Sequence, residues 1–307
     1  MPDSLAAAAD APVVAPLFRR LCIIGAGLIG GSLARRAHEG HAIAAEVVVS
    51  ARTGATLERV RALGFADRVV EDPAEAVRGA DLVVLCIPVG AYAEVMRAIA
   101  PNLASGAILT DAGSTKGSVL RDLLPLLPKG VHLIPGHPMA GTEHSGPDAG
   151  FASLFEGRYC ILTPPPGADP AAIAAVREFW RRCGAMVETM DAQTHDKVVA
   201  IVSHLPHLIA FTICGTADDL SEETRESVLK FAASGFRDFT RIAASDVSMW
   251  RDVFLNNREA VLEMLARFTE DAQAFGRAIR WGEEEFIVDR IQRGRKIRRS
   301  LIERHQA

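Results

Sequence analysis

The sequence has no cysteine arrangement that could build a metal site or a disulfide framework. No CxxC pair and no cysteine–histidine spacing of the zinc-binding kind occurs. Several cysteines lie within apolar runs, so we expect buried free thiols in a reducing compartment. The five cysteines are Cys22, Cys86, Cys160, Cys183 and Cys214.

The chain also has no surplus of positive charge. Its formal net charge is −4, which gives no reason to expect a nucleic-acid partner. A basic stretch over 290–299 follows the acidic run Glu283–Glu285, and we interpret it as a solvated helix whose cations suit the negative end of the helix dipole. An anionic ligand would therefore depend on local basic residues.

We expect neither a secretory leader nor a membrane anchor. The N-terminal residues are rich in alanine and proline without a basic residue before the apolar part, so we expect a disordered tail over 1–18. The most apolar long stretch, 198–217, contains Ser203, His204, Pro206 and His207. These polar residues and the proline favour a buried helix over a membrane span, and we expect a cytoplasmic protein.

The organisation of the chain predicts two domains, as its length of 307 residues also suggests. Apolar strands alternate with helices up to about residue 190, which indicates an α/β domain with a parallel sheet over 19–190. Strands are expected at 21–25, 46–50, 81–87, 107–111, 131–135, 159–163 and 186–190. Helices are expected at 28–39, 91–99, 115–124 and 170–183, with a further helix starting at Asp72–Pro73.

Beyond Asp191 the strand patterns vanish and helical periodicity takes over. This predicts an all-α domain over 191–307 with helices at 192–217, 222–233, 248–256, 258–280 and 283–305. Such elongated helices cannot bury their apolar faces within one chain, so we expect a homodimer.

A glycine-rich turn follows the first predicted strand. In Gly25-Ala-Gly27-Leu28-Ile29-Gly30, the first glycine permits a tight turn, the second lets backbone approach a pyrophosphate, and the third lets helix and strand pack closely. The helix that starts there offers backbone N–H groups to phosphate. We therefore assign Leu28, Ile29 and these glycines to a dinucleotide site, together with Ile87 and Pro88. A glycine-rich turn without a ligand is the alternative.

The end of the second predicted strand lacks the acidic residue that usually selects NAD. Ser50, Arg52 and Thr53 stand there instead. An acid would repel a 2′-phosphate, whereas these three side chains could bind one. The cofactor is thus expected to be NADP or NAD, with NADP favoured. Alternatively, Arg52 stacks on the adenine.

A histidine at a strand end is the main candidate for chemistry. In Gly136-His137-Pro138 the proline holds His137 away from helical backbone, on a stiff, extended turn after the strand 131–135. Open parallel sheets bind ligands at the carboxyl ends of their strands. Removal of hydride from a carbinol needs a neutral base with a pKa near the working pH, and histidine suits that task. A turn histidine bonded only to backbone is the alternative.

Four motifs together resemble one known family. Gly136-His-Pro-x-x-Gly-x-Glu143, Ser203-His-Leu-Pro-His207, Phe239-Thr-Arg241 and Met249-Trp250 are similar in order and spacing to the prephenate/arogenate (cyclohexadienyl) dehydrogenases, from about residue 20 to the C-terminus. The resemblance implies oxidative decarboxylation of prephenate and/or arogenate with hydride transfer to NAD(P)+. The product would be 4-hydroxyphenylpyruvate or tyrosine.

The resemblance also implies roles for individual residues. His137 would accept the hydrogen bond of the substrate's C4 hydroxyl, and Ser114 of Asp111-Ala-Gly-Ser-Thr-Lys116 would lie beside it. His207 would contact the side-chain end of the substrate. Arg241 would hold a carboxylate of this small anionic molecule, because a guanidinium makes two parallel bonds to one.

Each of these roles has a structural alternative. Ser114 could cap the next helix, and Arg241 could pair with Asp238 on a helix surface. Trp250 could be a core residue rather than a substrate contact, and Glu143 could be a surface carboxylate rather than a gate or partner of an arginine.

His204 and His207 share a helix face and are assigned to the substrate site. A satisfied buried histidine is the alternative for His207. We predict no metal, because two imidazoles without a third ligand make a poor site.

Two other classes of protein remain as alternatives. The β-hydroxyacid dehydrogenases also join a dinucleotide domain to a helical dimer domain, but their lysine is followed four residues on by asparagine. Here Lys197 is followed at that distance by Ile201. A non-enzymatic NADP sensor would not need His137, Ser114 and Arg241 to converge, and turnover would distinguish it.

Overall fold

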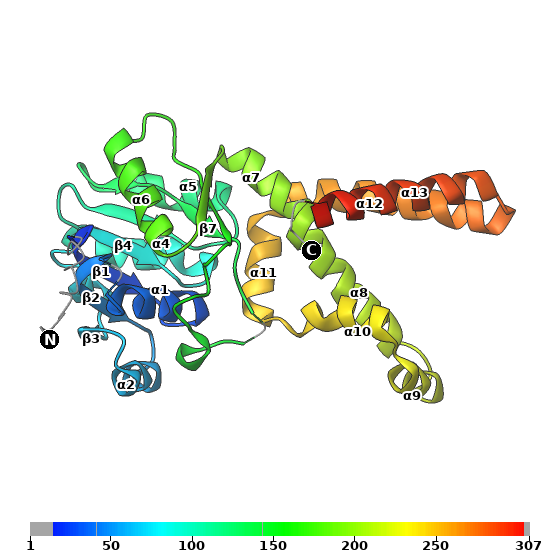
Figure 1. Ribbon diagram of the computed structural model, residues 1–307, viewed down its shortest axis with the longest axis horizontal. Coiled ribbons are helices and arrows are strands. Elements are labelled where there is room, and N and C mark those ends of the chain that lie inside the picture. The colour runs from blue at the N-terminus through cyan, green and yellow to red at the C-terminus, as the bar shows by residue number, and fades with distance from the viewer. Residues whose placement is uncertain (1–14, 41, 143, 304–307) are drawn as a thin grey trace, which may run out of the picture. The chain divides into compact units, whose positions relative to one another are not determined.

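The computed structural model describes residues 15–40, 42–142 and 144–303. By internal contacts the chain divides into two compact units, with the boundary between Asn257 and Arg258. The first unit holds both sheets and the helices up to α11, and the second holds the last two helices (Figure 1). Residues 1–14 of the predicted tail lie outside the described residues. Phe18, at the end of that prediction, is buried as the first residue of the first strand.

A six-stranded parallel sheet forms the centre of the first unit. Its spatial order is β3-β2-β1-β4-β5-β6, and every adjacent pair is parallel. This is the order of the doubly wound dinucleotide-binding fold, which confirms the predicted fold class. The strands are β1 (Phe18–Ile24), β2 (Ala44–Ser50), β3 (Arg68–Val70), β4 (Leu82–Leu85), β5 (Ile108–Asp111) and β6 (His132–Leu133).

Both faces of this sheet are covered. Along β1, Leu21 and Ile23 face one apolar cluster while Cys22 and Ile24 face the other, as the two-residue period of a strand requires. The first cluster includes residues of α1 (Leu28–His38), α2 (Gly54–Leu63) and α6 (Pro170–Arg182). The second includes residues of α3 (Pro73–Ala76), α4 (Tyr92–Ile99) and α5 (Gly117–Leu123). Burial on two faces explains why these strands are continuous apolar runs rather than alternating ones.

A smaller mixed sheet follows the parallel one. β7 (Gly136–Pro138) pairs antiparallel with β8 (Tyr159–Leu162), which pairs parallel with β9 (Met186–Thr189). The sequence predicts β8 and β9 but not that they leave the main sheet. His137, predicted in an extended turn, is indeed extended, but it sits in a strand opposite Ile161. Its backbone is therefore held by β8 as well as by Pro138.

Helices make up the remainder of the first unit. α7 (Ala192–Val199) continues through a π-helical turn, η5 (Ala200–His204), into α8 (Leu205–Asp218). The wider turn ends two residues before Pro206, which has no backbone N–H to give. After these come α9 (Glu222–Phe231), α10 (Ser234–Thr240), the short η6 (Arg241–Ala244) and α11 (Val247–Asn256).

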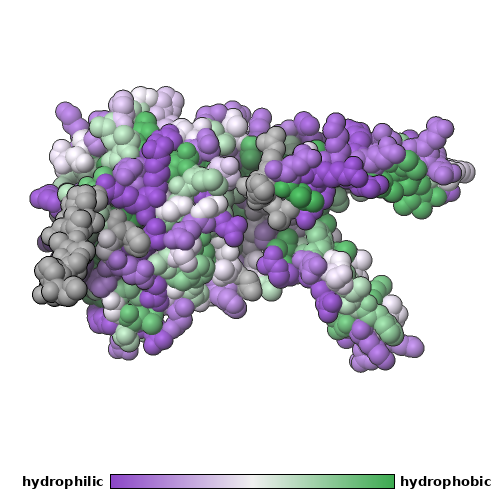
Figure 2. Space-filling view, in the orientation of Figure 1, coloured by the Kyte–Doolittle hydropathy of each residue, from purple (hydrophilic) through white to green (hydrophobic). Residues whose placement is uncertain are grey.

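The second unit consists of α12 (Arg258–Trp281) and α13 (Glu284–Glu303). Gly282, with a φ of +65°, lies between them in the left-handed conformation that glycine adopts without strain. Several large apolar side chains of α12 are solvent-exposed, among them Leu262, Phe268, Ile279 and Trp281. Figure 2 shows hydrophobic residues at the surface of these helices and, separately, of the α8–α9–α10 region.

The apolar stretch predicted as a buried helix is less buried than expected. By length and composition alone, Ala192–Asp218 could cross a membrane, and it is the only such helix among residues 15–303 that are described; 28% of its most apolar window is buried. Ile201 and Val202 are exposed, whereas His195, Asp196 and His204 are buried within this chain. Buried polar groups of this kind are typical of a protein interior, because lipid offers them no hydrogen-bond partner.

All five cysteines are free. Cys22, Cys160 and Cys183 are buried, and Cys86 and Cys214 are half-buried. Burial raises the pKa of the Cys22 thiol to about 12, which keeps it protonated and unreactive.

Candidate active site

The glycine-rich turn has the geometry that a dinucleotide site requires. Gly25 adopts a φ of +103°, and a Cβ there would lie 2.3 Å from the carbonyl oxygen of Cys86. A Cβ on Gly30 would lie 1.9 Å from the carbonyl oxygen of Gly25. A Cβ on Gly27, in contrast, would meet nothing within 4 Å. Packing therefore explains Gly25 and Gly30, while Gly27 borders open space at the N-terminus of α1, where a pyrophosphate could lie.

The other predicted cofactor residues surround this turn. Leu28 and Ile29 form the first turn of α1 and are half-buried. Ile87, which approaches Gly25, and the exposed Pro88 follow the end of β4. No side chain caps α1, so its first backbone N–H groups remain available to an anion. These residues fit a bound dinucleotide.

The end of β2 corrects one residue of the predicted phosphate site. Ser50 is 1% exposed, and its hydroxyl donates to the carbonyl of Glu71, so it is not available to a ligand. Thr53 is the N-cap of α2 and accepts a hydrogen bond from the backbone of Thr56. Arg52 is exposed beside it. Arg52 and the N-terminus of α2 thus remain as groups that could meet a 2′-phosphate.

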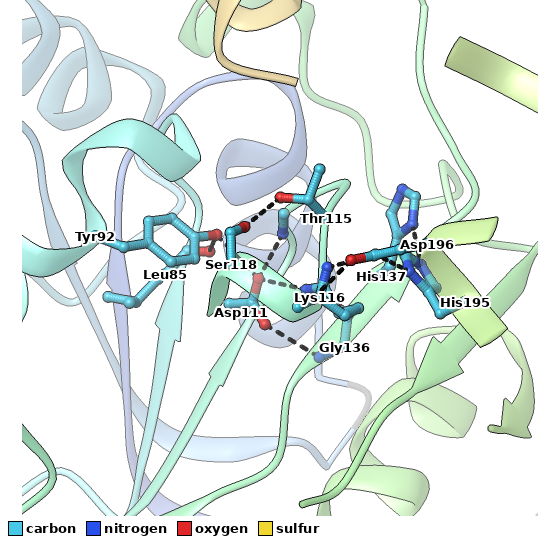
Figure 3. A network of polar contacts seen from close by, with 12 residues as sticks. Leu85, Tyr92, Asp111, Thr115, Lys116, Ser118, Gly136, His137, His195 and Asp196 are labelled. Atoms are coloured by element: carbon cyan, nitrogen blue, oxygen red, sulfur yellow. Dashed lines mark hydrogen bonds and ion pairs between the residues drawn. The ribbon is translucent and has the colours of Figure 1, made fainter. Parts of the chain in front are cut away.

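His137 is the first member of a buried chain of hydrogen-bonded side chains. Its Nδ1 lies 2.8 Å from Nε2 of His195, and Nδ1 of His195 lies 2.8 Å from Oδ1 of Asp196 (Figure 3). His137 is contributed by β7, whereas His195 and Asp196 belong to α7. Burial, reinforced by the neighbouring His195, Lys116 and His204, lowers the pKa of His137 well below its usual value. The imidazole is therefore neutral at physiological pH.

Asp196 also holds the loop that carries Ser114. Its Oδ1 accepts from the backbone N–H of Lys116 at 2.7 Å and its Oδ2 from that of Gly117 at 2.8 Å, at the start of α5. Burial raises the pKa of Asp196, but the bonds from His195, Lys116 and Gly117 outweigh burial, and the net shift is downward. Asp196 is thus an ionised carboxylate that caps a distant helix.

A fully buried ion pair lies beneath this chain. Nζ of Lys116 is 2.6 Å from Oδ2 of Asp111 and donates to the carbonyl of Gly136 at 2.6 Å. Asp111 also accepts from the backbone of Gly113 and Gly136 and from the hydroxyl of Tyr92. The pair therefore connects β5 to the residue just before His137. Breaking such a pair from one side is costly, because the other charge is left buried.

Ser114, two residues before Lys116, does not cap α5. The N-cap of that helix is Lys116, and the carboxylate of Asp196 satisfies its first N–H groups. The helix-capping alternative for Ser114 is therefore wrong. The half-buried Ser114 follows the end of β5, and His137 follows the end of the neighbouring β6, so both lie at the carboxyl edge of the sheet.

His204 and His207 do not share one environment. His204 is 1% exposed; its Nδ1 accepts from the amide of Asn257 at 3.1 Å, while its Nε2 is buried without a partner. Burial lowers the pKa of His204 to about 4. His207 is half-buried, and its Nδ1 donates to the carbonyl of Ser203 at 2.9 Å, which leaves Nε2 as an acceptor.

Trp250 is a buried residue, so its burial fits the core alternative as well as a contact with the substrate. It is buried on α11 and stacks on His207, and its indole Nε1 has no hydrogen-bond partner. Phe211 and Phe254 surround it. The orphaned polar atoms on Trp250 and His204 are the kind of buried group that a ligand commonly satisfies.

Arg241 begins η6, which packs against α8, and its side chain is exposed. Its positive charge contributes, after burial, to a lowered pKa of His207, so it lies in the same neighbourhood. Glu143 lies outside the described residues. Among the part of the chain that is described, no group of three or more His, Cys, Asp or Glu could hold a metal ion.

Sequence reasoning missed His195, Asp196, Asn257 and the Lys116–Asp111 pair. The only local signal was the polar character of Asp111-Ala-Gly-Ser-Thr-Lys116 at the end of a strand. The partner of Lys116 N–H is 80 residues away. No spacing rule for a single element reveals such a contact.

Two family models match most of the chain. A model of the prephenate dehydrogenase nucleotide-binding domain matches residues 36–189, and a model of the prephenate dehydrogenase dimerization domain matches residues 191–293. The chain belongs to the prephenate dehydrogenase family.

Similar relatives cover nearly the whole chain. Cyclohexadienyl dehydrogenase of Zymomonas mobilis is 39% identical over 94% of this chain and 98% of its own length. Prephenate dehydrogenase of Lactococcus lactis is 35% identical over 92% of this chain and 77% of its length. A crystal structure of prephenate dehydrogenase from A. aeolicus, in complex with hydroxyphenyl propionate and NAD+, has a TM-score of 0.84 at 32% identity and covers 92% of this chain and 98% of that one. The resemblance noted in the motifs is confirmed, and the β-hydroxyacid dehydrogenase alternative is not favoured.

Proposed function

We propose that this member of the family catalyses the oxidative decarboxylation of prephenate and/or arogenate with hydride transfer to NAD(P)+. The observation that carries the proposal is the buried, neutral His137, hydrogen-bonded through Nδ1 at the carboxyl edge of a dinucleotide-binding sheet. The relatives are named cyclohexadienyl and prephenate dehydrogenases, which supports the same chemistry here.

The chain's own residues supply binding and proton handling. His137 takes or shares the proton of the ring hydroxyl, and Ser114 lies at the neighbouring strand end as a second hydrogen-bonding group. Arg241 fixes a substrate carboxylate, and His207 and Trp250 enclose the side-chain end together with His204. As the C4 carbonyl forms, electrons flow from the ring carboxylate, CO2 leaves and the ring becomes aromatic. The nicotinamide, when bound, would supply the hydride acceptor.

Aromatisation drives the reaction forward, so the protein's task is to position and polarise the substrate. The neutral form of histidine is the one that suits this task, because an imidazolium cannot accept the hydroxyl proton. The lowered pKa of His137 keeps the base form populated throughout the neutral range.

The cofactor is NADP or NAD, and the proposal favours NADP. Arg52 is exposed at the end of β2 beside the N-terminus of α2, and no acidic side chain stands between Ser50 and Thr53. The crystal structure of the A. aeolicus relative contains NAD+ rather than NADP+. NAD is therefore the alternative cofactor for this chain.

The assembly we propose is a homodimer built through the helices after Asp191, in a cytoplasmic protein without a nucleic-acid or membrane partner. The exposed apolar side chains of α12 and of the α8–α9 region support it, because a single chain leaves them in water. The match to a dimerization-domain model over 191–293 agrees.

A two-by-two assay tests the function: prephenate and arogenate against NAD+ and NADP+, with reduced cofactor followed by absorbance and CO2 by trapping. Turnover with at least one pair, at one CO2 per hydride, is expected. Cofactor binding without turnover of either substrate would instead favour the non-enzymatic sensor.

A further inference from the structure

The hydrogen bonds that link His137, His195 and Asp196 determine which ring nitrogens of the two histidines carry protons. Asp196 is ionised and can only accept hydrogen bonds, and its Oδ1 lies 2.8 Å from Nδ1 of His195. Nδ1 of His195 must therefore carry a proton. Burial lowers the pKa of His195, so the ring is neutral and its Nε2 is bare.

The same logic extends one ring further. The bare Nε2 of His195 lies 2.8 Å from Nδ1 of His137, so the hydrogen between them belongs to His137. A neutral His137 with a proton on Nδ1 has no proton on Nε2. The lone pair that a general base needs is thus placed on the nitrogen that points away from the chain of hydrogen bonds.

We infer that Asp196, acting through His195, is a positioning residue that fixes His137 as the Nδ1–H tautomer, with Nε2 as the catalytic base. This inference rests on the proposed function for its catalytic part. When the hydroxyl proton moves to Nε2, the electrons of its O–H bond form the C4 carbonyl, and the hydride that C4 loses would go to the NAD(P)+ that the proposed reaction consumes. The positive charge that His137 gains is stabilised by His195 as acceptor and by the negative charge of Asp196. No proton needs to pass beyond His137.

Asp196 also links the position of His137 to that of the loop that carries Ser114. The same carboxylate caps α5 through the backbone of Lys116 and Gly117, two and three residues after Ser114. There is little room to rearrange it, because a Cβ on Gly117 would lie 2.9 Å from its Oδ2. One carboxylate from α7 therefore positions both the base and the serine loop.

Direct observation of the tautomer tests the inference without requiring turnover. We would record ¹⁵N–¹H spectra of the wild-type chain labelled at histidine ring nitrogens, with His137→Gln to assign the His137 signals. The expected result is a protonated Nδ1 and an unprotonated Nε2 on His137. A protonated Nε2 on His137 in the wild type would overturn the inference, whatever the enzyme's substrate.

Kinetics of His195 variants test the catalytic part. His195→Phe keeps a ring but removes the acceptor, so His137 should lose its single tautomer and kcat should fall at least about tenfold, with the KM values for substrate and cofactor changed less than about threefold. His195→Gln, whose amide oxygen can accept from Nδ1 of His137, should retain more kcat than His195→Phe.

The matched control is Asp191→Ala. It removes the N-cap of the same helix, which Asp191 provides through the backbone of Thr194, but leaves the His195–Asp196 contact in place. We expect lower stability with an unchanged His137 tautomer and kcat. If Asp191→Ala lowers kcat as much as His195→Phe does, or if His195→Phe leaves kcat unchanged, α7 acts only as structural support and the inference is wrong.

Discussion

His207 and Trp250 stack with their ring centroids 3.7 Å apart and their planes inclined by 23°. The two residues come from α8 and α11, so the stack brings together two helices separated in sequence by α9, α10 and η6. Arg241 begins η6, within electrostatic reach of His207. An imidazole and a buried indole are thus in contact, with a cation in the same neighbourhood, and this grouping can be tested residue by residue.

Arg241→Ala is expected to raise KM for the substrate by about ten- to a hundredfold and to leave cofactor affinity nearly unchanged. A charged hydrogen-bonded contact is worth about 1.5–3 kcal/mol, which corresponds to that range. Steady-state kinetics with Arg237→Ala as the matched control would measure it. Wild-type KM and kcat in Arg241→Ala would show that Arg241 does not bind the substrate and would favour the surface ion pair with Asp238.

His137→Asn is expected to lower kcat by about a hundredfold or more, the usual scale of general acid–base help. Asparagine keeps the size and polarity of the residue but cannot take a proton. The acid limb of the kcat/KM profile should lie below pH 6.5 in the wild type, because burial and the facing His195, Lys116 and His204 lower the pKa of His137. Undiminished kcat in His137→Asn would remove this residue from the mechanism.

Arg52→Ala is expected to lower kcat/KM for NADP+ more than for NAD+, because it removes the exposed cation at the end of β2. Wild-type enzyme should use NADP+ at least as well as NAD+. The control is Arg97→Ala, an exposed arginine of α4. A strong wild-type preference for NAD+, with a ratio that Arg52→Ala does not change, would contradict the expectation.

His204 should make the folded state less stable in acid. Burial lowers its pKa from 6.5 to about 4, so below pH 6.5 the unfolded chain binds a proton that the folded chain does not. Stability from this group is complete above pH 6.5 and is lost as pH falls toward 4, by about 1.4 kcal/mol per pH unit. Denaturant unfolding of wild type and His204→Gln over that range would measure it. Parallel pH curves for the two proteins would show that His204 contributes nothing.

Light scattering at micromolar concentration is expected to give the mass of a dimer. Trp281 and Ile279 of α12 are 72% and 65% exposed in the single chain, and burying such side chains is the main source of association energy. Trp281→Glu or Ile279→Glu should raise the dissociation constant. Gln273→Glu adds the same charge at an exposed polar position of the same helix and serves as the control. A wild-type monomer would contradict the proposal.

The sequence predicts the elements well because their signals are local. The apolar runs of β1, β4 and β5, the Asp72–Pro73 helix start and the glycine turn depend on neighbouring residues alone. The three-residue β3 was not predicted, because Arg68–Val70 is too short for a periodic pattern and is held by pairing with β2.

The site was predicted only where a motif or a resemblance carried it. Gly27, His137 and His207 lie in such motifs. The pairing of His195 with His137 joins residues 58 positions apart, and the contact of Asn257 with His204 joins residues 53 apart. Ser50 was misassigned because the sequence shows which residues end a strand but not which way a hydroxyl turns.

The π-helical turn η5 adds one residue to the helix that runs from Ala192 to Asp218. Each residue advances an α-helix by about 100°, so that addition sets the angular phase between His195 before the turn and His207 after it. Regular α-helical winding of the same residues through 200–204 would rotate all of α8 by about 100° relative to α7. His195 and His207 would then lie on different sides of the helix, although no residue of the site itself had been changed.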